Sequence, residues 1–123
     1  MARLTEPDRL AAYLDALNNW AVSGCISFDR FSKEGAEYLR KLGVKQRELK
    51  ELMYDYVAAG GEIDEVRESS RDFEFEFHYD LRFPILGKRV YVETRMSPDY
   101  PRVPVETLES TIFVVNMHDE KAF

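Results

Sequence analysis

Residues 72–83 read DFEFEFHYDLRF, and apolar and polar residues alternate along them almost without interruption. Phenylalanine, tyrosine and leucine occupy the odd positions, whereas charged residues and one histidine occupy the even positions. Successive side chains of a β-strand point to opposite faces of a sheet, so this pattern predicts a strand with one buried and one solvated face. Residues 88–96, KRVYVETRM, alternate in the same way, and Pro84 and Gly87 mark a bend between the two segments. We therefore predict a β-hairpin over residues 71–96.

The register of this hairpin follows from its charges. One register places Arg82 opposite Glu93, and it also places Asp80 opposite Arg95. Slipping the strands by two residues places Asp80 opposite Glu93 instead. Opposite charges directly across a sheet contribute about 0.2–1 kcal/mol, whereas like charges destabilise it. We therefore predict the first register, with residues 87–88 at the centre of the turn.

The part of the chain before the hairpin predicts three helices. Apolar residues at helical spacing, together with capping signals, indicate helices at about 6–21, 32–42 and 45–59. Thr5 and Ser32 are the expected N-caps of the first two helices. We expect the third helix to pack on the apolar face of the hairpin. The expected contacts join Leu49, Leu52, Met53 and Tyr56 to Phe75, Phe77, Leu81 and Val92.

Further strands complete the predicted sheet. Residues 62–68 indicate a short edge strand, and residues 111–117 indicate a strand that is apolar on both faces. Residues 26–29 form either a short strand or an extended lead-in. Three prolines make residues 97–109 an irregular loop, and long loops in compact domains are often functional. The order of elements predicts an α+β domain, with helices packed on one face of a three- to four-stranded, mostly antiparallel sheet.

Length and composition indicate a single soluble domain. A chain of 123 residues with 45% hydrophobic residues can bury one core, so we expect one domain over residues 1–123. No apolar run approaches the roughly 18 residues of a membrane span. The first residues, MARLTEPDRL, are charged where a signal peptide would be apolar. Cys25 is the only cysteine and has no partner for an internal disulfide. We therefore expect a cytoplasmic protein that makes no contact with a membrane.

Charge is distributed unevenly along the chain. The net charge of −6 argues against indiscriminate binding to nucleic acids. Residues 82–102 are the exception, because they contain five basic and only two acidic residues. This segment is the return half of the hairpin and the loop after it. A phosphate-bearing partner is therefore expected to bind there.

The polar face of the hairpin carries the candidate functional residues. We expect Glu93, His78 and Tyr91 as catalytic residues, and Arg82, Arg89 and Arg95 as phosphate-binding residues. His118 shares a strand face with Asn116 and is an additional candidate. Metal-free cleavage of RNA requires a base, an acid and cations that stabilise the charged transition state. Glutamate or histidine supplies the first two, and arginine supplies the third. The alternative interpretation is a solvated face whose ion pairs satisfy one another.

Common catalytic and cofactor motifs are missing from the sequence. It contains no GxxxxGK[ST], GxGxxG, HExxH, CxxC or GxSxG pattern. Glu76, His78 and Asp80 share one strand face, but residues two apart on a strand lie about 6.6–7 Å from each other. That spacing is too wide for these three residues alone to chelate one ion. We therefore expect neither a metal nor a cofactor.

Several segments between residues 31 and 118 resemble a known toxin fold. They are FSKEGAEYLRKLGV, QRELKELMYDYVAAG, FHYDLRFPILGKRVYVETRM and TIFVVNMH. In order and apolar pattern they resemble the RelE/MqsR-like toxins of type II toxin–antitoxin pairs and related uncharacterised families. The resemblance implies a core at about 26–118, an antiparallel sheet backed by two helices, a ribonuclease-type face and an antitoxin partner. The helix at 6–21 is then an addition to the core.

Two readings of the function follow. In the first, the protein is a metal-independent endoribonuclease toxin that cleaves RNA on the polar face of residues 72–96. Such toxins are usually basic, however, whereas this chain is acidic. In the second, the protein is a non-catalytic interaction module that kept the fold. It would bind a protein partner through the loop at 97–109 and an exposed edge of the sheet.

Overall fold

The structure is a computed structural model that describes residues 2–22, 24–67, 77–97 and 110–120. The helices are α1 (Pro7–Asn18), α2 (Lys33–Leu42) and α3 (Gln46–Ala58). The strands are β1 (Ala2–Arg3), β2 (Ile26–Ser27), β3 (Asp64–Arg67), β4 (Phe77–Ile85), β5 (Lys88–Ser97) and β6 (Thr111–Asp119). The α+β class is confirmed. None of the helices in the described residues is long and apolar enough to span a membrane.

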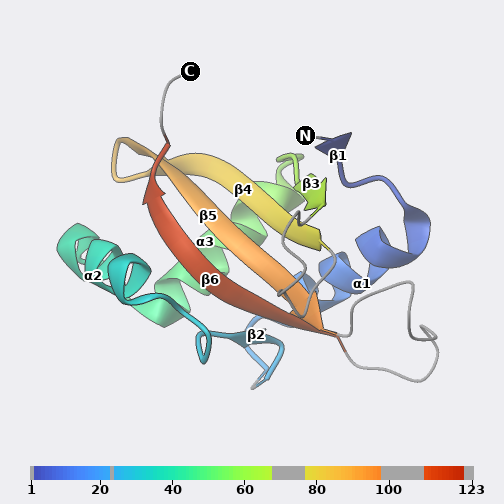
Figure 1. Ribbon diagram of the computed structural model, residues 1–123, viewed down its shortest axis with the longest axis horizontal. Helices are drawn as coiled ribbons and strands as arrows, with labels where there is room; N and C mark the ends of the chain where they lie inside the picture. The colour runs from blue at the N-terminus through green and yellow to red at the C-terminus, as the bar shows by residue number, and fades with distance from the viewer. Residues whose placement is uncertain (1, 23, 68–76, 98–109, 121–123) are drawn as a thin grey trace.

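The described strands form one sheet in the order β1-β3-β4-β5-β6-β2. Every pairing is antiparallel except that of β2 with β6, which is parallel. The sheet has six strands instead of the predicted three to four, because β1 and β2 add two residues each at its two edges. α1 and α3 lie across one face of the sheet, and α2 lies beside β6 (Figure 1). We call the face under α1 and α3 the covered face, and the opposite face of β3–β6 the open face.

Odd-numbered residues of β4 form the covered face, as their periodicity predicts. Phe77, Tyr79, Leu81, Phe83 and Ile85 are all buried there. On α3, Leu49 and Met53 are fully buried, while Leu52 and Tyr56 pack partly buried against the same core. The ring of Tyr56 stacks on that of Phe83 at 5.0 Å between centroids. The predicted burial of Phe77, Leu81 and Val92 in one core with these residues of the third helix is confirmed, whereas Phe75 lies outside the described residues.

α1 belongs to the same core as the sheet. The buried hydroxyl of Tyr13 donates to Thr94 Oγ1 at 2.9 Å, and Thr94 Oγ1 donates in turn to the carbonyl of Tyr79 at 2.6 Å. Every polar atom of this buried link is therefore satisfied. The N-cap of α1 is Glu6 and not the predicted Thr5, because the Glu6 carboxylate accepts hydrogen bonds from the backbone N–H groups of residues 8 and 9. The predicted cap of α2, Ser32, is confirmed.

The predicted register of the β4–β5 hairpin is wrong. Ile85 pairs with Lys88, so Leu86 and Gly87 form a two-residue turn. Their φ angles are 51° and 81°, and the common two-residue hairpin turn of this kind requires positive φ at both positions. Glycine adopts this conformation without steric cost, so Gly87 suits the second central position, which the predicted turn would have given to Lys88. The turn therefore sets the register that the charge argument had rejected.

This register gives Asp80 and Arg82 new partners across the strands. Asp80 lies opposite Glu93, and Arg82 lies opposite Tyr91. The predicted cross-strand pairs, Arg82 with Glu93 and Asp80 with Arg95, do not form as register pairs. Like charges are tolerated because each acid finds its partner two residues away on its own strand. His78 contacts Asp80, and Arg95 contacts Glu93.

Candidate functional site

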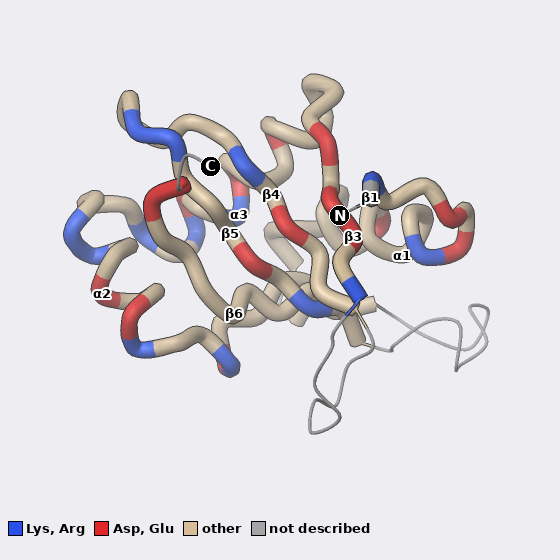
Figure 2. Tube along the Cα trace, turned by 45° about the horizontal axis from the view of Figure 1, so that its top comes forward, with Lys and Arg blue, Asp and Glu red and all other residues tan. Residues whose placement is uncertain are grey.

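The open face brings all the predicted site residues together on three adjacent strands. His78 and Arg82 lie on β4, Arg89, Tyr91, Glu93 and Arg95 lie on β5, and His118 lies on β6. Acidic and basic positions are interleaved along β4 and β5 (Figure 2). Among the described residues, α1 and α3 lie on the opposite side of the sheet (Figure 1). The candidate functional residues therefore lie together on the open face.

A β-bulge aligns the end of β6 with the open face. Glu93 pairs with Asn116 and Thr94 with Val114, so Val115 is an extra residue in β6. The bulge lets buried side chains continue on the covered face on both sides of it. His118 consequently lies across from Tyr91, and their rings stack at 4.7 Å between centroids with 21° between planes. The predicted common face of Asn116 and His118 is confirmed.

The centre of the open face is a histidine held by a buried carboxylate. His78 Nδ1 lies 2.8 Å from Asp80 Oδ1. The Asp80 side chain is only 2% exposed, whereas that of His78 is 16% exposed. A buried acid that binds one imidazole nitrogen fixes the orientation of the ring and favours the protonated form of the other nitrogen during a reaction. Asp80 was not among the predicted site residues, because the predicted register paired it with Arg95.

Tyr91 lies beside the carboxylates of Asp80 and Glu93. Its hydroxyl lies 3.4 Å from Glu93 Oε1. Burial raises the pKa of Tyr91 well above its ordinary value, and the charge of Asp80 raises it further. The phenol therefore stays protonated at neutral pH and serves as a hydrogen-bond donor. The guanidinium of Arg82 lies 5.0 Å from the centroid of the ring and adds a cation–π contact.

Each candidate arginine is paired with a carboxylate. Arg95 NH1 lies 2.9 Å from Glu93 Oε2, and Arg95 is 5% exposed. Arg89 Nε lies 2.8 Å from Glu120 Oε2. Arg82 contacts Asp64 on β3, and its Nε also lies 3.7 Å from Glu120 Oε1. Asp64 and Glu120 were missed as neighbours of the site, because their place depends on strand order and not on a local pattern. The positive charge expected on this face is thus largely neutralised.

Three potential metal ligands also meet on the open face. Ligand atoms of His78, Asp80 and Glu93 all lie within 4.8 Å of one another. The sequence suggested a different trio, with Glu76 in place of Glu93, and Glu76 lies outside the described residues. Glu93 joins the group only because the observed register sets it opposite Asp80. His78 and Asp80 are still two residues apart on β4, but their side chains converge to 2.8 Å, so the strand spacing does not exclude a metal at this trio.

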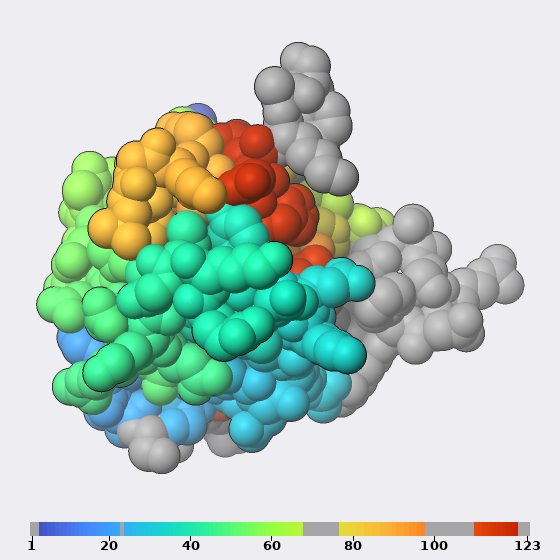
Figure 3. Space-filling model, turned by 90° about the vertical axis from the view of Figure 1, so that its left-hand side faces the viewer, coloured from blue at the N-terminus to red at the C-terminus, as the bar shows by residue number. Residues whose placement is uncertain are grey.

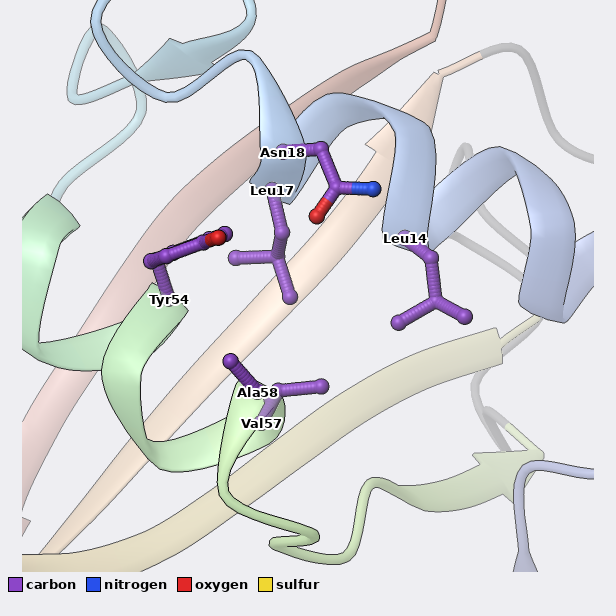
Figure 4. A pocket seen from close by; sticks show the side chains of 6 residues that line it. All are labelled: Leu14, Leu17, Asn18, Tyr54, Val57 and Ala58. Carbon is purple, nitrogen blue, oxygen red and sulfur yellow. The ribbon is translucent and has the colours of Figure 1, made fainter.

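Two hollows elsewhere on the molecule have linings that are mainly apolar or acidic. A cavity of about 130 Å³ between α1 and α3 is lined by apolar side chains with Asn18 and Tyr54, and no charged residue lines it (Figure 4). A groove of about 420 Å³ lies between the α2–α3 junction and the hairpin turn. In Figure 3 the turn, in orange, lies beside the green surface of these helices. The charged residues of this groove are Glu48, Glu51 and Asp55, so it repels phosphate groups.

The open face thus joins a carboxylate-held imidazole, a protonated phenol and guanidinium groups on one rigid surface. Such a set is suited to proton transfer beside an anionic group. The His78 imidazole is bound to Asp80, and the Tyr91 hydroxyl lies beside Glu93. No family model, no curated protein and no solved structure matches this chain.

Proposed function

We propose that the open face binds RNA and cleaves it without a metal ion, as an endoribonuclease toxin restrained by an antitoxin protein. The observation that carries this proposal is the His78–Asp80 pair, with 2.8 Å between Nδ1 and Oδ1 and with Asp80 buried. The resemblance of residues 31–118 to RelE/MqsR-like toxins supports the same class of reaction. The α+β fold and the helix-backed sheet agree with that resemblance.

In this mechanism His78 is the general base. It takes the proton of a ribose 2′-hydroxyl, whose oxygen then attacks the adjacent phosphorus. The bond from phosphorus to the 5′-oxygen breaks, and the protonated imidazole returns the proton to that oxygen. The products are a 2′,3′-cyclic phosphate and a 5′-hydroxyl. Glu93 is the weaker candidate for this base because its carboxylate is already bound to Arg95.

Tyr91 and the arginines stabilise the charged phosphorane. The Tyr91 hydroxyl donates a hydrogen bond, because its raised pKa keeps it protonated. Arg82, Arg89 and Arg95 supply cations on the same strands. Arg89 is the most accessible of them, with 63% of its side chain exposed. A phosphate must exchange with Glu120 to bind it, so we expect modest affinity that falls steeply with salt.

One observation favours the second function, a non-catalytic interaction module. All three arginines already have carboxylate partners, which weakens the attraction of the open face for RNA. The net charge of −6 acts in the same direction. In this alternative the partner is a protein bound at the sheet edge and at residues 97–109, of which residues 98–109 lie outside the described residues. The two functions differ in whether the purified protein cleaves RNA.

The decisive experiment compares His78→Gln with the wild-type protein on a labelled RNA in the presence of EDTA. Glutamine keeps a polar group beside Asp80 but removes the titratable nitrogen. We expect cleavage to fall by about 10²–10⁴-fold, which is the usual contribution of a general base. The control is Arg40→Ala, since the Arg40 side chain is 78% exposed on α2. It should cleave like the wild type.

Growth inhibition provides a second readout. Expression of the wild-type chain without a partner should arrest growth, and expression of His78→Gln should not. Arg89→Ala is the cleaner probe of phosphate binding, because truncating the buried Arg95 would leave Glu93 without its partner. A wild-type protein that neither cleaves RNA nor inhibits growth would exclude the nuclease and leave the interaction module.

A further inference from the structure

The hairpin register creates an electrostatic conflict at the centre of the open face. Asp80 and Glu93 lie directly opposite each other on β4 and β5. Two carboxylates at such a site repel each other, and this repulsion is stronger where water is excluded. Asp80 is almost fully buried, and His78 lies on the same side, two residues away. Glu93 is also paired with Arg95.

We propose that His78, Asp80 and Glu93 form a binding site for a transition-metal dication of the zinc type. One imidazole nitrogen and two carboxylate oxygens are a common donor set for such ions, which bind nitrogen more readily than Mg²⁺ or Ca²⁺ do. Three protein ligands leave coordination positions for water. A dication also removes the repulsion between the two carboxylates.

The geometry requires only small adjustments. Zinc–ligand bonds of 2.0–2.2 Å place neighbouring ligand atoms about 3–3.5 Å apart. The three ligand atoms already lie within 4.8 Å of one another. Asp80 is buried, whereas His78 and Glu93 are 16% and 24% exposed. Closing the site therefore requires ligand atoms to move by about 1–2 Å.

The surroundings supply outer contacts for these ligands. Arg95 holds Glu93 through Oε2, and Oε1 of Glu93 lies beside the Tyr91 hydroxyl. Groups that hold a ligating carboxylate in this way orient it and raise metal affinity. Tyr91 also shields the ion from bulk water on one side, since it lies against Asp80 and Glu93.

Metal binding would regulate the open face, and this part of the proposal rests on the function proposed above. When one imidazole nitrogen ligates a metal, the other nitrogen carries the ring proton, so neither nitrogen can accept a proton from RNA. The metal-bound protein is therefore the inactive form, and removal of the metal restores cleavage. Binding itself does not depend on any catalytic activity.

The experiment titrates the EDTA-treated and dialysed protein with ZnCl₂ by calorimetry. We expect one site in the wild-type protein and affinity at least about tenfold weaker in His78→Gln and in Glu93→Gln. The matched control is His118→Gln, because His118 is the only other histidine and lies outside the trio. It should bind zinc like the wild type. MgCl₂ should give no binding at the same concentrations.

Thermal melts of the metal-free variants test whether each variant is folded. If His78→Gln does not fold, Glu93→Gln alone serves as the ligand variant. The site is overturned if the wild type does not bind zinc, or if His118→Gln loses as much affinity as the folded ligand variants. In the cleavage assay, loss of activity on addition of zinc supports the regulatory role, whereas stimulation or no change overturns it. Zinc binding that requires His78 in a protein that never cleaves RNA would reject the proposed nuclease and retain the metal site.

Discussion

The two faces of the β4–β5 hairpin contrast sharply, although they are built from neighbouring residues. On the covered face Leu81 lies opposite Val92, and both are completely buried. On the open face the preceding and following residues, Asp80 and Glu93, lie opposite each other. A slip of two residues would exchange one apolar pair for another on the covered face, but it would change every charged pair on the open face. The fold thus tolerates a register error that the chemistry of the site does not.

The largest expected effect is on the covered face. Leu81→Ala removes buried methyl groups from the centre of the core, so we expect the free energy of unfolding to fall by about 2–5 kcal/mol. Urea denaturation monitored by circular dichroism measures this change. Leu86→Ala is the matched control, because Leu86 is 76% exposed at the turn, and it should change stability by no more than about 0.5 kcal/mol. Equal losses in the two variants would contradict the assignment of the faces.

A smaller effect is expected at the turn, which decides the pairs on the open face. Gly87→Ala forces a Cβ into a positive φ of 81°, although no atom lies within 4 Å of that Cβ. The cost is therefore conformational, about 1–2 kcal/mol. Leu86→Asn should act in the opposite direction and stabilise the protein by about 0.5–1 kcal/mol, because asparagine tolerates positive φ. Thermal unfolding of both variants tests this, and a neutral Gly87→Ala would argue against the turn at residues 86–87.

The smallest effect concerns α1, which completes the covered face. The hydrogen bond from the Arg9 backbone N–H lowers the pKa of Glu6, although burial opposes this shift slightly. A lowered pKa means that the charge stabilises the fold above the ordinary pKa of glutamate, and this contribution is lost as the pH falls through the folded-state value. Glu6→Gln should therefore cost less than about 1 kcal/mol at pH 7, because the site is partly exposed, and less than that near pH 3.

The measurement is the free energy of unfolding of both proteins at the two pH values. Glu51→Gln on α3 is the control, since Glu51 is exposed and caps no helix. Its effect should be small at both pH values. A cost of Glu6→Gln that persists unchanged in acid would show that the Glu6 charge has no role in the cap.

Local signals predicted much of the covered side of the molecule. The end of α2 at Leu42 follows from Gly43, which adopts a φ of 73°, and its beginning follows from Ser32, whose Oγ accepts from the Gly35 N–H. The inward face of α3 follows from helical spacing. These features depend on residues that are close in sequence, and the apolar stripe of each helix is buried against the sheet.

The open side was predicted only in part. The residues of the face were identified, because strand periodicity assigns side chains to faces. The partners of these residues were not identified. Cross-strand charge pairs contribute too little free energy to outweigh the turn conformation that Gly87 favours. Arg95 was expected at a solvated ion pair with Asp80, and instead it is buried beside Glu93.

The sequence by itself determines the α+β class, the helices, and the division of β4 and β5 into an apolar and a polar face. These features follow from periodicity, caps and turn residues, which are patterns that span two to four residues. The tertiary structure alone decides the His78–Asp80–Glu93 cluster and the ion pairs of Arg82 with Asp64 and Glu120. These contacts join side chains on different strands, so they depend on how β3, β4, β5 and the end of β6 pair with one another. Such contacts depend on the free-energy balance of the whole sheet, in which each charged pair is a small term.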